Sequence, residues 1–110
     1  MDFNEYQKKA LTTAGYDEKY KVIYPALGLG NEAGEVLGKV KKWLRGDDGE
    51  GIISNERKDA LKEELGDVLW YLAVLSHDLG LSFDDVAKTN INKLQSRNKR
   101  GTIKGDGDKR

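Results

Sequence analysis

The stretch that decides the fold is LKEELGDVLWYLAVLSHDLG, residues 61–80. Apolar residues recur in it every three or four positions, the period of a helix rather than a strand. They are Leu61, Leu65, Val68, Leu72, Leu75 and Leu79. From Val68 to Leu75 the stretch is apolar on every side, so we expect this helix to be buried on more than one face. Ser54 or Asn55 supplies an N-cap, and Gly80 ends the helix.

The helical period continues on both sides of this stretch. It predicts a first helix over residues 3–14 and a second from Pro25 to the stop at Gly46. A loop follows to Ile53, and Ser82 opens a fourth helix that frays after Arg97. No segment alternates as a strand does, so the expected fold class is all-α and four-helix bundle-like.

Four glycines in the second predicted helix each disfavour helix by up to ~1 kcal/mol relative to Ala. They are Gly28, Gly30, Gly34 and Gly38. Packing or a ligand must compensate, which suggests a role for these positions.

Composition narrows the class of protein. The 110 residues suit one helical domain, residues 1–98, followed by a Gly-rich tail, residues 99–110. From residue 97 onward there are six basic residues and two acidic ones, but the whole chain is neutral, so we do not expect nucleic acid as a partner. The chain has no Cys and only one His, His77, which excludes thiolate zinc and multi-His sites. No apolar run is long enough for a membrane span and the N-terminus lacks an export pattern, so we expect a soluble, cytoplasmic protein.

Two acidic pairs occupy matching positions on the second and third predicted helices. On wheels with Leu29 and Leu61 as origins, Glu32 and Glu35 lie at roughly 300° and 240°, and Glu64 and Asp67 lie at nearly the same two angles. Packing the two helices side by side therefore brings four carboxylates together. Four negative charges do not converge without a cation, and oxygen ligands alone suit Mg²⁺, with Mn²⁺ as a second choice. The alternative is that these acids are solvated and pair with lysines, namely Lys39, Lys42 or Lys62.

Three motifs resemble a known family. They are GLGNEAGEV at residues 28–36, EELGDVLWY at residues 63–71 and NINKL at residues 90–94. In this order they are similar to the MazG-like nucleoside triphosphate pyrophosphohydrolases of the all-α NTP pyrophosphatase superfamily, whose signature is Glu-Glu-x-x-Glu followed by Glu-x-x-Asp. The resemblance implies Mg²⁺-dependent hydrolysis of (deoxy)nucleoside triphosphates to monophosphate and pyrophosphate, with Glu32, Glu35, Glu64 and Asp67 as metal ligands.

One position departs from that signature. Asn31 stands where the family has its first Glu, and an amide cannot accept a proton from water at neutral pH. Glu63 is the candidate catalytic residue in place of the missing Glu. Two interpretations of its side chain remain open: it orients water, or it only faces solvent.

Basic side chains must hold the rest of the triphosphate. Lys93 and Arg97 lie at i, i+4 in the fourth predicted helix, one turn after Asn90, and Lys42 is a further candidate. The resemblance places substrate contacts on an Asn-x-x-Lys, here Asn90 and Lys93. The alternative to substrate binding is that Lys93 and Arg97 belong to an ordinary solvated face of the helix.

Four helices of a single chain cannot bury all of the apolar helix faces that the sequence predicts. We therefore expect a homo-oligomer, a dimer or tetramer, with helices paired across subunits and the site near a subunit boundary. The tail either folds over bound phosphates or is disordered.

The alternative to an enzyme is a helical interaction module with a structural cation-binding cluster. Trp43, Trp70 and Tyr71 are interpreted as packing residues rather than a base pocket.

Overall fold

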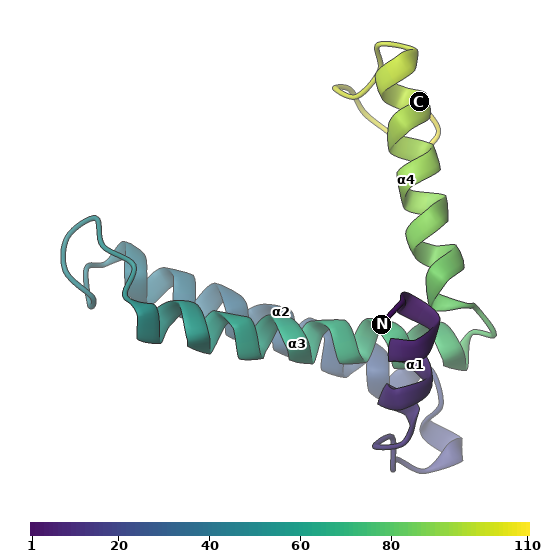
Figure 1. Cartoon of the computed structure of the whole chain (residues 1–110), viewed down its shortest axis with the longest axis horizontal. Coiled ribbons are helices and arrows are strands. Elements are labelled where there is room, and N and C mark those ends of the chain that lie inside the picture. Colours follow the sequence, from purple (N-terminus) through teal and green to yellow (C-terminus); the bar gives the residue numbers. More distant parts are fainter.

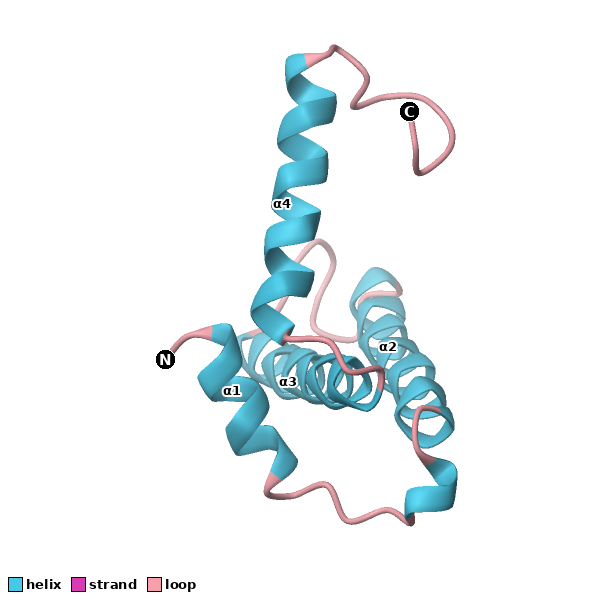
Figure 2. Ribbon diagram, turned by 90° about the vertical axis from the view of Figure 1, so that its right-hand side faces the viewer, coloured by secondary structure: helices cyan, strands magenta, loops and turns pink.

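The computed structural model describes residues 1–110 and contains helices but no strand (Figures 1 and 2). The α-helices are α1 (Phe3–Leu11), α2 (Ile23–Leu44), α3 (Asn55–Asp78) and α4 (Phe83–Lys99), and a short 3-10 helix η1 (Glu18–Tyr20) precedes α2. The predicted all-α, four-helix class is confirmed, and none of these helices is long and apolar enough to cross a bilayer.

Side-chain caps set two helix starts where the sequence predicted them. The Ser54 hydroxyl accepts from the Arg57 backbone N–H at 3.0 Å, and the Ser82 hydroxyl accepts from the Asp85 N–H at 3.2 Å. The first helix ends at Leu11 and is therefore shorter than the predicted range, residues 3–14. The hydroxyls of Thr12 and Thr13 donate to carbonyls of its last turn, so the chain leaves the helix before Gly15.

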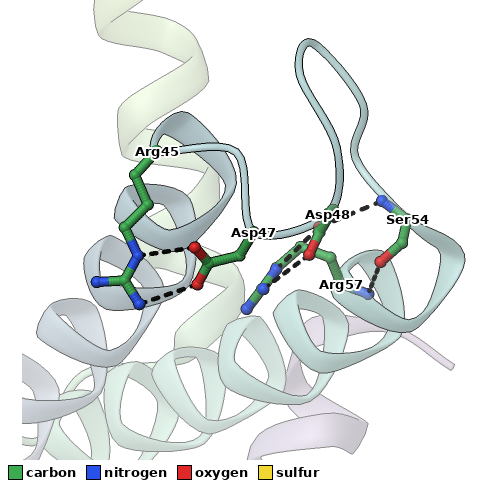
Figure 3. A network of polar contacts seen from close by, with 5 residues as sticks. All are labelled: Arg45, Asp47, Asp48, Ser54 and Arg57. Carbon is green, nitrogen blue, oxygen red and sulfur yellow. Dashed lines mark hydrogen bonds and ion pairs between the residues drawn. The ribbon is translucent and has the colours of Figure 1, made fainter.

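Helices α2 and α3 lie side by side and run in opposite directions as a long hairpin (Figures 1 and 2). Figure 3 shows the polar network that closes the connecting loop. The Arg57 guanidinium donates to both carboxylate oxygens of Asp48, at 3.1 and 2.8 Å, and holds the pKa of Asp48 below its usual range. At the other end of the hairpin, Asp78 accepts from the Val22 backbone N–H at 2.9 Å and from the Tyr16 hydroxyl at 2.5 Å. Each end of the hairpin is thus held by one carboxylate.

A small core lies where α1 crosses α3 and α4 begins. It consists of Ala10, Ala73, Val74 and Phe83. Buried Gln7 donates to the carbonyls of Ala73 and Leu81, and its side-chain oxygen accepts from the Phe83 N–H, so one amide joins three helices. Trp70 packs against this core and donates to the Ala10 carbonyl at 3.2 Å, in agreement with its predicted packing role.

From this core, α4 projects away from the hairpin and the chain is open in shape (Figure 1). The radius of gyration is 17.0 Å, against about 13 Å for a compact domain of this length. The tail folds back on α4, where the Arg97 guanidinium donates to the Asp108 carbonyl. Within the tail, the Arg110 guanidinium donates to the carbonyls of Thr102, Ile103 and Gly107.

The outer face of α2 carries apolar side chains that nothing in the chain covers. Ile23, Leu27, Leu37 and Leu44 are 60 to 80% exposed, and with Gly30, Gly34 and Lys41 they follow alternating steps of four and three residues. Such spacing is typical of a helix-packing seam. We call these seven residues the outer seam of α2; it lies opposite the face that packs on α3.

Candidate metal centre

Three carboxylates meet between the two helices of the hairpin. Oxygen atoms of Glu32, Glu64 and Asp67 all lie within 4.8 Å of one another. Glu32 comes from α2, and Glu64 and Asp67 come from successive turns of α3. We call these three residues the acidic cluster. The side-by-side packing expected from the helical wheels therefore brings acids of both pairs together.

The acidic cluster raises the pKa of one of its own members. Partial burial is the main cause for Glu32, and the neighbouring carboxylates of Asp67, Glu64 and Glu35 add to it. Both effects favour the protonated form, because a second negative charge close by and the loss of water each penalise the anion. A cation bound among these oxygens reverses that penalty.

The donor set fits a hard divalent ion. All three ligands are carboxylate oxygens, and Mg²⁺–oxygen distances of about 2.1 Å place opposite ligands of one ion about 4.2 Å apart. Adjacent ligands of such an ion lie about 3 Å apart, so the carboxylates, whose oxygens lie within 4.8 Å of one another, would have to turn inward to bind one ion together. No histidine or thiol is near enough to favour a softer metal.

A tyrosine sets the contact between the helices one turn away from the acidic cluster. The Tyr71 ring lies directly on Gly28: a Cβ atom at Gly28 would be 2.1 Å from the ring. Gly28 is four residues before Glu32, and Tyr71 is four residues after Asp67. Of the four α2 glycines singled out from the sequence, Gly28 thus has a packing reason, whereas Cβ atoms at Gly30, Gly34 and Gly38 would meet nothing within 4 Å.

The hydroxyl of Tyr71 faces the same acids. Burial raises its pKa, and the Tyr24 side chain, Glu32 and Asp67 raise it further. Tyr71 therefore stays neutral beside the carboxylates. Sequence reasoning placed Tyr71 in the packing and did not find this neighbourhood; the i, i+4 spacing from Asp67 was the available signal.

One lysine reaches the acidic cluster. The Lys39 ammonium lies 3.3 Å from a carboxylate oxygen of Glu64, and both side chains are largely covered. The sequence offered Lys39 only as a partner for solvated acids. The pair exists, but it joins α2 to α3 rather than successive turns of one helix.

The remaining acids and Lys42 lie outside the acidic cluster. Glu35 is exposed and influences Glu32 without being one of the three close residues. Glu63 is exposed one turn before Asp67 on α3, where it lines a hollow together with Asp59, Lys62 and Gly66, and it is not one of the three close residues. Lys42 is exposed in the last turn of α2.

The residues predicted to bind substrate on α4 are not gathered around the acidic cluster. Asn90 and Lys93 are exposed on the projecting helix (Figure 1). Arg97 is 5% exposed because the tail covers it, and its guanidinium donates to the Asp108 carbonyl. Within one chain the acidic and basic parts of the predicted site are therefore separate.

Comparison with known proteins gives the same assignment as the three sequence motifs. A profile of the MazG nucleotide pyrophosphohydrolase domain matches residues 25–102, from the first turn of α2 to just beyond α4. The chain belongs to the MazG nucleotide pyrophosphohydrolase domain family. It is also 45% identical to the Gene 37 protein of Mycobacterium phage L5, with 116 aligned positions that span both chains completely. No solved structure matches it.

The MazG match covers both helices that supply the acidic cluster and all of α4. Helix α1, with the Gln7 amide that joins α3 to α4, lies outside the matched range.

Proposed function

We propose that this MazG-family protein hydrolyses (deoxy)nucleoside triphosphates to the monophosphate and pyrophosphate in the presence of Mg²⁺, with Mn²⁺ as a substitute. The observation that carries the proposal is the convergence of Glu32, Glu64 and Asp67 within 4.8 Å between two helices. Family membership supports a nucleotide substrate.

Glu32, Glu64 and Asp67 would hold the ion, and Glu35 would complete the set from the next turn of α2. A divalent ion bound there screens the phosphate charge and lowers the pKa of water. The chain's own contribution is position: the hairpin is clamped at Asp48 and Asp78, and the Tyr71 ring against Gly28 sets the spacing between the helices.

Attack on the α-phosphorus also needs a group that receives a proton from the attacking water. Asn31 cannot do so, and we propose Glu63 for this role. Glu63 is exposed and precedes Asp67 by one helical turn on α3, so the role requires that the substrate extend from the acidic cluster along this side of the helix.

Asn90 and Lys93, with Lys42 and Arg97, are proposed to bind the triphosphate. Because α4 projects from the hairpin, we propose that these residues act on the acidic cluster of a second copy in a homo-oligomer. The outer seam of α2 and the radius of gyration of 17.0 Å support assembly, since apolar surface of this extent is rarely left exposed.

The test is product analysis. Purified protein is incubated with each common ribo- and deoxyribonucleoside triphosphate and Mg²⁺, and the products are separated by ion-exchange chromatography. We expect equimolar monophosphate and pyrophosphate from at least one of them, and no product when a chelator replaces Mg²⁺. Release of orthophosphate alone, or no turnover of any triphosphate, would reject the proposal.

Sedimentation of the protein at micromolar concentration tests the assembly separately. We expect dimers or tetramers, and a monomer alone would contradict the arrangement proposed for α4.

A further inference from the structure

The ion pair between Lys39 and Glu64 is the only ion pair that links α2 directly to α3. The ammonium and carboxylate lie 3.3 Å apart, and the two side chains are 23% and 17% exposed. The other ion pairs lie within the connecting loop and its flanks or join residues three or four apart in sequence. Lys39 therefore meets one of the proposed metal ligands from the opposite helix.

Charge explains why a lysine sits at this place. Three carboxylates within 4.8 Å repel one another, and Lys39 is the one cation that forms an ion pair with any of them. A divalent ion bound to Glu64 supplies the same compensation more strongly. Two cations beside one carboxylate repel each other, so metal and ammonium compete for Glu64.

A released Lys39 would remain beside the metal centre. It follows Glu32 by seven residues, two turns or about 10 Å along the same face of α2. The basic residues of α4, by contrast, lie on a helix that projects away from the hairpin (Figure 1). Lys39 is thus a cation of the same chain that already lies beside the acidic cluster.

We propose that Lys39 is the resident counter-ion of the acidic cluster, that the divalent metal displaces it from Glu64, and that the freed ammonium then binds a phosphate oxygen of the nucleotide. This inference rests on the proposed function. It assigns to Lys39 two effects of opposite sign, against the metal and in favour of the substrate.

The experiment measures both effects by titration calorimetry on Lys39→Met. Mn²⁺ alone is titrated first, and then a non-hydrolysable α,β-imido deoxynucleoside triphosphate is titrated at saturating Mn²⁺. We expect Mn²⁺ to bind about fivefold more tightly to Lys39→Met than to the wild type, since a competing charge is gone. We expect the nucleotide to bind about tenfold more weakly, since a charge-assisted hydrogen bond is lost.

Two matched variants control the experiment. Lys58→Met removes an exposed lysine near the start of α3 that forms no ion pair, and it should leave both affinities at wild-type values. Lys39→Arg keeps the charge and should stay within about twofold of wild type in metal affinity. Circular dichroism verifies that each variant keeps its helices.

Equal Mn²⁺ affinity in Lys39→Met and Lys58→Met, or unchanged nucleotide affinity in Lys39→Met, would overturn the inference. Either result leaves the proposed function standing as long as the wild type hydrolyses a triphosphate to pyrophosphate. Wild-type protein that binds Mn²⁺ but no nucleotide would instead reject the proposed function.

Discussion

The hairpin of α2 and α3 and the arm formed by α4 with its tail differ in how far each is organised within one chain. In the hairpin, acids from two helices already converge, and Asp48 and Asp78 hold its two ends. In the arm, Asn90 and Lys93 face solvent, and Arg97 is covered by the tail. This difference is the basis of our proposal that the single chain holds the metal, whereas a second copy contributes the α4 residues that bind the substrate.

The largest effect is expected from the hairpin. Glu32→Gln, Glu64→Gln and Asp67→Asn each remove a carboxylate from the proposed metal site, and pyrophosphate release should fall at least about 100-fold. Glu35→Gln should also remove most of the activity if Glu35 completes the ligand set. Glu56→Gln, an exposed acid in the first turn of α3, is the matched control and should be fully active. Full activity in the variants of the acidic cluster would contradict the assignment of these acids as metal ligands.

Gly28→Ala should disturb the hairpin by steric overlap. The new Cβ would lie 2.1 Å from the Tyr71 ring, so either the ring or the helix must move. We expect a loss of about 1 to 3 kcal/mol in the free energy of unfolding, and a weaker Mn²⁺ affinity because Glu32 and Asp67 lie one turn away. Chemical denaturation and calorimetry measure the two quantities.

Two further variants separate packing from helix propensity. Gly28→Ala combined with Tyr71→Leu should recover part of both losses. Gly66→Ala adds a Cβ in open space and should keep or raise stability by up to ~1 kcal/mol. A destabilised Gly66→Ala beside a normal Gly28→Ala would contradict the packing role of Tyr71.

Variants of the arm test whether α4 of one copy acts on the acidic cluster of another copy. Lys93→Met should raise KM about tenfold with little change in metal affinity, because the residue is distant from the acids of its own chain. Mixing inactive Glu64→Gln protein with Lys93→Met protein, after exchange of subunits, should restore roughly a quarter of the wild-type rate at low substrate if one copy supplies acids and the other supplies Lys93. A rate no higher than the sum of the separate proteins would show that α4 serves its own chain.

The smallest effect is expected in the pH dependence of the melting temperature of the metal-free protein. The pKa of Glu32 is raised above its ordinary value of 4.5 in the folded state. The stability that this residue contributes is therefore fully present below pH 4.5 and is lost as pH rises through the higher folded pKa. Without metal, Glu32→Gln should melt a few degrees above the wild type at pH 7 and show a smaller difference at pH 4. Thermal melts in chelator measure this, and a wild type that melts higher than the variant at pH 7 would contradict it.

Much of the fold follows from local rules. Ser54 and Ser82 cap α3 and α4 as predicted, because an N-cap depends only on a side chain and the backbone three residues later. The end of α1 was predicted too far along because the two threonine hydroxyls compete for its last carbonyls. The short helix η1 has no apolar period and was missed.

The sequence by itself determined which acids belong together, since matching i, i+3 pairs on two helical wheels depend only on helix geometry and residue order. Only the tertiary structure decided that Glu32, Glu64 and Asp67 are the closest three, that Lys39 pairs with Glu64, and that the Tyr71 ring occupies the space left by Gly28. Those contacts depend on how far one helix is rotated and shifted against another, and that arrangement is set by packing across the whole hairpin rather than by any single stretch of chain.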